Sequence, residues 1–163
     1  MKLFRVRNTH AYGGSHLYTI GNIDPKIVNP LDYNIYKLWT LKLNSSSDGG
    51  WKPLPPMNFP HRHFSCSIVL DGKLHVFDGF SSEFFENCGW MEAYDPISNT
   101  WESLFGPPLL VPPFSVCMYA ALESKQHIVV ALLCDPKLKT LFTYNISNRC
   151  WTKLAHHFDV QPG

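Results

Sequence analysis

A short basic and aromatic run, HRHF at residues 61–64, offers the most distinctive recognition chemistry in this sequence. Arg62 carries a planar guanidinium that stays charged and forms paired hydrogen bonds with a carboxylate. His61 and His63 flank it, and Phe64 adds an apolar ring. These four side chains are therefore candidates for binding an acidic partner peptide. In the alternative reading, Arg62 holds its own connecting segment by donating to backbone carbonyls.

A second candidate group follows about twenty residues later and consists of Phe84, Phe85 and Asn87. Exposed aromatic side chains near an arginine are typical of protein-binding surfaces, where a few such anchors supply most of the affinity. The alternative is that the two phenyl rings pack beneath their own loop. Together with residues 61–64, this group forms the partner-binding surface that the sequence predicts.

Catalytic motifs are missing from the sequence, which contains no G-x-S-x-G, H-E-x-x-H, P-loop or C-x-x-C pattern. His156, His157 and Asp159 are the nearest approach to a metal-binding tract. Adjacent residues of a strand point to opposite faces, so the two histidines make a poor ligand pair. We therefore predict no catalytic residue, no metal and no cofactor.

Four short strands must position the two candidate groups. Alternation of apolar and polar residues predicts these strands over 64–70, 73–79, 90–95 and 100–104. Asp71-Gly72 lies between β-rich flanks and is a strong hairpin signal. The run 96–99 turns the chain again. A four-stranded antiparallel meander of this length is typical of one β-propeller blade.

A repeat with a period of 50 residues runs through the chain. It is marked by three tryptophans, each followed three residues later by a leucine: Trp51 and Leu54, Trp101 and Leu104, Trp151 and Leu154. Tyr94 and Tyr144 precede the last two tryptophans by the same distance. In the first copy we expect Leu43-Asn44 to take the place of the tyrosine and its neighbour.

With this period and these residues, the sequence resembles kelch-repeat β-propeller proteins, in the style of plant F-box/kelch-repeat proteins. The family's repeat has an apolar second strand ending in two glycines, then a tyrosine and, after a six-residue gap, a tryptophan. The residues that match this pattern are Gly21 and Trp51, then Gly79, Tyr94 and Trp101, then Tyr144 and Trp151, while Asp78 stands in place of the first glycine of its pair. The third copy lacks the glycine pair. The resemblance implies that these residues are structural and that the tryptophans pack between blades.

The expected fold is all-β, with about three kelch-type blades that do not close into a ring alone. We assign residues 1–60 to the first blade, 61–113 to the second, 114–155 to a degenerate third and 156–163 to a tail. Outside the middle blade we expect strands over 9–12, 16–21, 36–43, 115–122, 126–133, 140–145 and 150–154, with Trp51 opening one more. The proline-rich run 53–60 is predicted to be a crossover that cannot pair.

The number of blades raises a question of closure. Propellers typically contain about 4–8 blades, whereas three copies use the whole of this chain. An open arc of three blades would expose two apolar blade faces. We therefore expect either a fragment or truncated product, or a chain that self-associates to complete a propeller.

Long connecting segments should gather at one end of the blades, because consecutive turns of a meander alternate between its two ends. These segments are 22–34, 55–63, 80–89, 106–114 and 133–139. Long loops on a rigid scaffold commonly carry function. Both candidate groups fall within them.

Composition narrows the class of protein. The 163 residues are 45% hydrophobic and 17% charged, which favours a packed domain over disorder. A formal net charge of +1 gives no reason to expect nucleic acid or membrane as a partner. No signal peptide is evident, and five widely spread cysteines favour reduced thiols, so we expect a cytoplasmic or nuclear location.

The sequence therefore predicts a non-enzymatic protein–protein interaction module with a partner of unknown identity. The resemblance further implies substrate recognition for a ubiquitin ligase, because kelch proteins often carry an F-box or BTB domain that joins them to cullin-type ligases. Two alternatives stay open. One is a metal-dependent kelch-type enzyme, similar to copper oxidases or to iron-dependent specifier proteins, although the latter's ligand run is absent. The other is a degenerate fragment without activity.

Overall fold

The computed structural model describes residues 9–13, 16–20, 38–43, 50–58, 66–77, 88–108, 115–122, 124, 126–135 and 138–155. Within these ranges the regular structure is β, in three antiparallel sheets of four strands each. The predicted all-β architecture of four-stranded meanders is therefore confirmed. No helix in the described residues is long and apolar enough to cross a membrane.

The strands of each sheet follow one another in sequence. The first blade contains β1 (Thr9–Gly13), β2 (His16–Ile20), β3 (Leu38–Lys42) and β4 (Lys52–Pro53). The second contains β5 (Cys66–Leu70), β6 (Lys73–Phe77), β7 (Cys88–Asp95) and β8 (Thr100–Phe105). The third contains β9 (Ser115–Leu122), β10 (His127–Asp135), β11 (Leu138–Asn145) and β12 (Cys150–Ala155).

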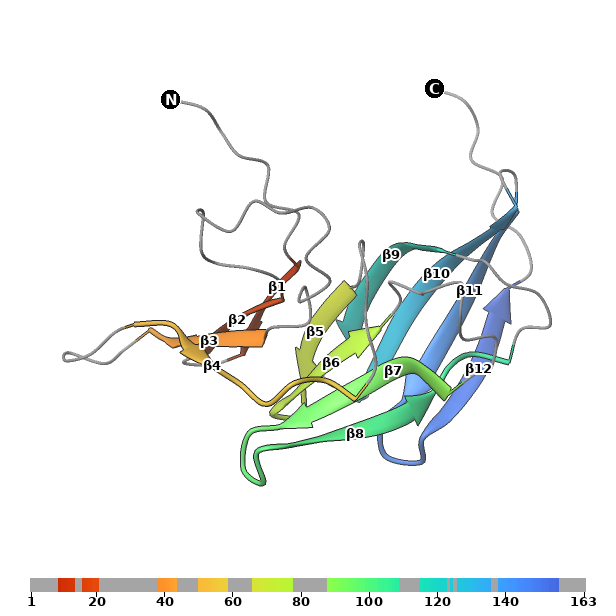
Figure 1. Cartoon of the computed structure of the whole chain (residues 1–163). Coiled ribbons are helices and arrows are strands. Elements are labelled where there is room, and N and C mark those ends of the chain that lie inside the picture. Colours follow the sequence, from red (N-terminus) through yellow and green to blue (C-terminus); the bar gives the residue numbers. More distant parts are fainter. Residues whose placement is uncertain are drawn as a thin grey trace, which may run out of the picture.

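The three blades lie side by side, with the second between the other two (Figure 1). Strand β1 contacts β5, and β5 contacts β9, so the first strands of successive blades are neighbours. The fourth strand of each blade forms the opposite edge of its sheet. This is the arrangement expected for consecutive blades of a propeller.

Tight turns close the hairpins of the second and third blades in matching ways. Asp71 and Gly72 have φ angles of 53° and 70°, as a two-residue type I′ hairpin turn requires. In the next turn the Asp95 carboxylate accepts hydrogen bonds from the backbone N–H groups of the residues two and three positions on, and Asn145 does the same 50 residues later. Asn99 and Arg149, also 50 residues apart, both have positive φ. The 50-residue repeat therefore extends to individual hydrogen bonds.

Two apolar cores join the blades. The core between the first and second blades, called here the first junction, contains Tyr18, Ile20, Leu38, Met57, Leu74, Val76 and Tyr94. The core between the second and third blades, the second junction, contains Cys66, Leu70, Phe77, Trp90, Met91, Ala93, Leu104, Ile128, Val130, Leu132, Phe142 and Tyr144. Alternate residues of the middle sheet point to opposite faces, so one sheet supplies both cores.

Two expectations for the first blade are wrong. Leu43 does not take the position of Tyr94: Thr40 pairs with Lys52, and extending this register places Leu41 opposite Trp51. The loop is therefore longer than the sequence spacing suggested, and Leu43 is exposed. Pro53 does pair, opposite Trp39, because β4 is an edge strand whose outer side needs no N–H donor. The repeat residues Gly21, Asp78 and Gly79 lie outside the described residues.

Candidate functional site

The seven candidate partner-binding residues, His61, Arg62, His63, Phe64, Phe84, Phe85 and Asn87, lie outside the described residues. The strands that follow them are described, and they show where the two segments enter the blade. Strand β5 begins at Cys66 and β7 begins at Cys88; both are antiparallel to β6, so they start at the same end of the second blade. We call this end the loop end and the opposite one the turn end. The strands that follow the two candidate groups in the sequence thus start at one end of the blade.

The crossover that leads to residue 61 is anchored at Asn58. The backbone N–H of Asn58 donates to the Glu92 carboxylate at 3.0 Å, and its side-chain amide donates to the Ser103 hydroxyl at 3.4 Å. Glu92 is fully buried in β7. A carboxylate bound to a backbone N–H makes a charge-assisted hydrogen bond, stronger than a neutral one. This contact fixes the chain three residues before His61.

A tryptophan holds each crossover where it leaves its blade. The Trp101 indole N–H donates to the Pro55 carbonyl at 2.9 Å, and the Trp151 indole N–H donates to the Phe105 carbonyl at 2.8 Å. After Phe105, Gly106 passes so close to Trp90 that an added Cβ would lie 2.9 Å from the tryptophan Cβ. A larger residue at 106 would therefore push the crossover away from the second junction.

Comparison with known proteins gives the same architecture. No family model matches the chain. Two F-box/kelch-repeat proteins of Arabidopsis thaliana are 27% and 25% identical over 91% and 89% of this chain. The solved structure of YjhT superposes with a TM-score of 0.64 at 14% identity, over 92% of this chain.

The chain has the fold of part of a β-propeller and is similar to kelch-repeat proteins. It spans 39% and 35% of the length of the two plant relatives, and half of the YjhT chain. At 14% identity, the likeness to YjhT concerns the fold alone. The plant relatives extend the likeness to the repeat itself.

In this arc of blades the recurring tyrosines and tryptophans form stacked pairs. The ring centroids of Tyr94 and Trp101 are 5.3 Å apart, and those of Tyr144 and Trp151 are 5.0 Å apart. The first pair packs in the first junction and the second pair in the second junction. Each pair belongs to one blade and faces the preceding blade. In the described structure these aromatic residues contact protein, not an open ligand site.

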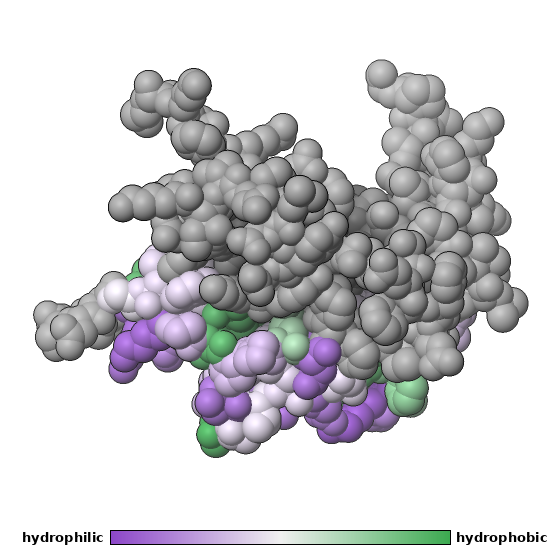
Figure 2. Space-filling view, in the orientation of Figure 1, coloured by the Kyte–Doolittle hydropathy of each residue, from purple (hydrophilic) through white to green (hydrophobic). Residues whose placement is uncertain are grey.

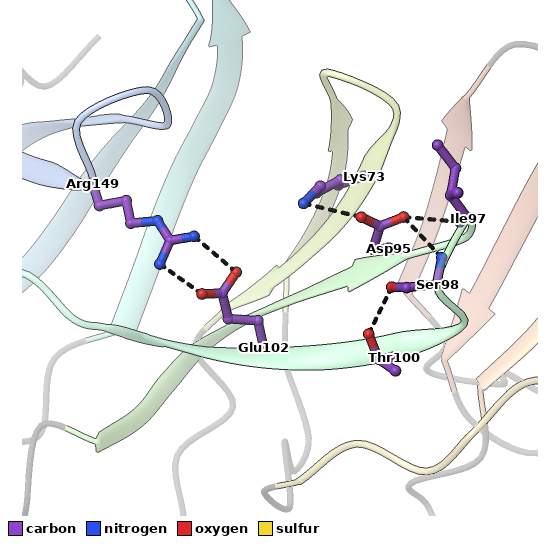
Figure 3. Close-up of polar contacts among 7 residues, drawn as sticks. All are labelled: Lys73, Asp95, Ile97, Ser98, Thr100, Glu102 and Arg149. Carbon is purple, nitrogen blue, oxygen red and sulfur yellow. Dashed lines mark hydrogen bonds and ion pairs between the residues drawn. The ribbon is translucent and has the colours of Figure 1, made fainter.

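Polar contacts at the turn end hold hairpins and join blades. Lys73 pairs with Asp95 at 3.1 Å, and Arg149 of the third blade forms a two-point ion pair with Glu102 of the second (Figure 3). The N–H of Ile97 and the Lys73 ammonium lower the pKa of Asp95. The four side chains that make these contacts are partly exposed to solvent.

The visible surface of the turn end is mainly hydrophilic, with small apolar patches (Figure 2). Among the described residues, three exposed apolar side chains lie at this end: Ile97, which is 96% accessible, at the tip of the β7–β8 turn, Leu43 after β3, and Leu122 at the end of β9. Isolated apolar residues are normal on protein surfaces and do not make a binding site. The described part of the turn end therefore shows no cluster of exposed aromatic residues.

No group of three or more His, Cys, Asp or Glu side chains in the described residues could hold a metal ion. The buried histidine, His75, lies in β6 on the face of the second junction, and neither of its ring nitrogens has a hydrogen-bond partner in the described structure. Burial lowers its pKa to about 4; Lys73 adds to this shift, while the Leu70 backbone and Asp71 oppose it. A neutral, enclosed imidazole of this kind is part of the core.

Sequence reasoning missed two residues that shape the loop end, Asn58 and Glu92. Glu92 did carry a signal: it is a charged residue in the middle of the run Trp90–Tyr94, whose other side chains are apolar or aromatic. A charged residue at such a position needs a buried partner. Asn58 carried no signal, because its partner is 34 residues away in another blade.

Proposed function

We propose that this chain is a protein-interaction module that binds its partner at the loop end. The observation that carries the proposal is that β5 and β7, the strands that follow residues 61–64 and 84–87 in the sequence, start at the same end of the second blade. The hydrogen bond that anchors Asn58 supports the proposal. A chain segment that is already held in place loses less conformational entropy when a partner binds next to it. The hydrophilic turn end, held by its own ion pairs, supports it as well.

In finer detail, we propose that the module recognises substrates for a ubiquitin ligase and works without catalysis of its own, in the cytoplasm or nucleus. The support is similarity to F-box/kelch-repeat proteins over 91% and 89% of this chain. The chain covers less than half of either relative, so this role is inferred from longer proteins. Arg62 would pair with a carboxylate of the substrate, and Phe84 would supply the apolar anchor.

The test is a comparison of bound proteins. The chain, a double variant with Arg62→Ala and Phe84→Ala, and a turn-end control with Ile97→Ala are each used to capture proteins from cell extract. We expect specific partners to fall at least about tenfold with the double variant, the loss typical of two anchor residues, and to stay with the control. Equal capture by all three proteins would move the site away from the loop end. Matching thermal midpoints would show that all three are folded.

The ligase role is tested separately, on a partner that passes the first test. Its ubiquitin content and half-life are measured in cells with and without this chain. We expect both to change, because the chain would either deliver the partner to a ligase or shield it from one. If neither changes, the interaction stands and the ligase role is rejected.

A further inference from the structure

The Trp-x-x-Leu segment of each blade contacts two different neighbours. Residues three apart on a strand point to opposite faces. At the first junction Leu54 of the first blade and Trp101 of the second pack on the same core. At the second junction Leu104 of the second blade and Trp151 of the third do the same. Each blade therefore presents its tryptophan to the preceding blade and its leucine to the following one.

The tryptophan also makes the same hydrogen bond at both junctions. Trp101 donates to the carbonyl of Pro55, the residue after Leu54. Trp151 donates to the carbonyl of Phe105, the residue after Leu104. In both cases donor and acceptor are separated by 46 residues. A junction thus consists of one leucine, the carbonyl that follows it, and the tryptophan of the next blade.

At the two ends of the arc, one tryptophan and one leucine of the repeat take part in neither junction. Trp51 is half-buried, belongs to neither core, and has no hydrogen bond to another described residue. Leu154 is 54% exposed, whereas the equivalent Leu104 is 8% exposed. Leu122, on the third blade, is also exposed. The chain therefore carries two separated halves of a third junction.

We propose that a second copy of this chain completes that junction. Leu154 of one copy packs against Trp51 of the other, and the Trp51 indole donates to the carbonyl of Ala155. The same contact forms again between the remaining free faces. The match to YjhT covers half of that chain, so two copies of this arc would together equal its length. A head-to-tail contact of this kind closes when the copies are related by a half turn.

The new junction differs from the second junction in one respect. Arg149 and Glu102 join the turn end of the second junction by an ion pair. Fifty residues after Glu102 the sequence has Thr152, which carries no charge. Salt screens exposed ion pairs and leaves apolar contacts in place. The dimer should therefore persist at high salt.

Mass in solution tests the proposal, by light scattering on the size-exclusion peak of the whole chain. We expect a dimer of twice 18.7 kDa. Trp51→Ala and Leu154→Asp, each alone, should weaken dimerisation at least about tenfold, as loss of a central apolar anchor does. Ile97→Asp, an equally apolar-to-acidic change at the turn end, should leave the dimer intact. Circular dichroism confirms that each variant is folded.

Mixing the two damaging variants tests the head-to-tail geometry. In a mixed pair, Leu154 of the Trp51→Ala copy meets the intact Trp51 of the Leu154→Asp copy, so one junction is fully native. We expect the mixture to dimerise more strongly than either variant alone. A monomeric wild-type chain, or a dimer that neither variant weakens, would overturn the proposal. A dimer that mixing does not restore would overturn the head-to-tail arrangement. None of these outcomes depends on the loop-end partner.

Discussion

The two junctions of this arc are built on the same repeat but enclose different polar groups. Both contain a leucine, the following carbonyl and a tryptophan of the next blade. The first junction side of the middle sheet also buries Glu92, which binds the backbone of Asn58. The second junction side buries His75, whose ring nitrogens have no partner in the described structure.

This difference shows what the repeat does and does not specify. Tryptophan and leucine at a 50-residue spacing set how neighbouring blades meet. The repeat does not fix the other residues on each face of a blade. Here these residues give the first junction an anchored crossover and the second junction a larger, more aromatic core. The junctions should therefore differ in their response to core truncation, to pH and to loss of a hydrogen bond.

The largest effect is expected from truncating the aromatic core of the second junction. Phe77 is fully buried and contacts the rings of Trp90 and Tyr119. Phe77→Ala should lower the free energy of unfolding by about 3–5 kcal/mol, since it removes a large buried side chain and leaves a cavity. Leu38→Ala is the matched change in the first junction and should cost less. Urea unfolding curves measure both, and a greater loss for Leu38→Ala would reverse the comparison.

Acid should weaken the protein through the second junction. The pKa of His75 is about 4 in the folded chain and about 6.5 when unfolded, so the unfolded state binds an extra proton between these values. The contribution of neutral His75 to the free energy of unfolding is therefore complete above pH 6.5. As the pH falls from 6.5 towards 4, the free energy of unfolding decreases by about 3 kcal/mol.

His75→Leu tests this assignment, because it removes the titrating group and keeps an apolar side chain. The variant should lose less stability than the wild type between pH 7 and pH 4, as measured by unfolding at each pH. Carboxyl groups titrate in both proteins, so the difference between the two curves isolates His75. Curves that run parallel would show that this imidazole does not control the acid response.

A smaller effect is expected at the anchor of the first junction. Glu92→Ala leaves the N–H of Asn58 without its acceptor and should cost about 1–3 kcal/mol. Glu92→Gln keeps an acceptor oxygen and should cost less. Amide hydrogen exchange at Asn58 should quicken in the alanine variant and change little in the glutamine variant. Equal exchange in both variants would show that Glu92 does not anchor the crossover.

The smallest effect belongs to the ion pair at the turn end. Arg149 and Glu102 make two contacts, at 2.6 and 3.2 Å, but their side chains are 62% and 44% exposed. Water and salt screen such pairs, so Arg149→Ala should change the free energy of unfolding by less than about 1 kcal/mol. The change should shrink further at high salt. A large, salt-independent loss would indicate that Arg149 matters for packing instead.

Local patterns in the sequence predicted much of this fold. Alternating apolar residues gave the strands of the second and third blades, and Asp71-Gly72 marked a hairpin turn that the φ angles match. Such signals depend on residues that are close along the chain. They were less reliable in the first blade, where Leu43 was aligned in the wrong register and Pro53 was excluded from a strand.

By itself, the sequence determined the repeat: three tryptophans and three leucines at a spacing of 50, and therefore blades of one kind. Only the tertiary structure decided which partner each of these residues has. Trp101 meets Pro55 and Glu92 meets Asn58 across gaps of 46 and 34 residues. Residues so far apart in the sequence come into contact only when separate sheets pack face to face. That packing depends on the shape of whole surfaces, not on any local pattern.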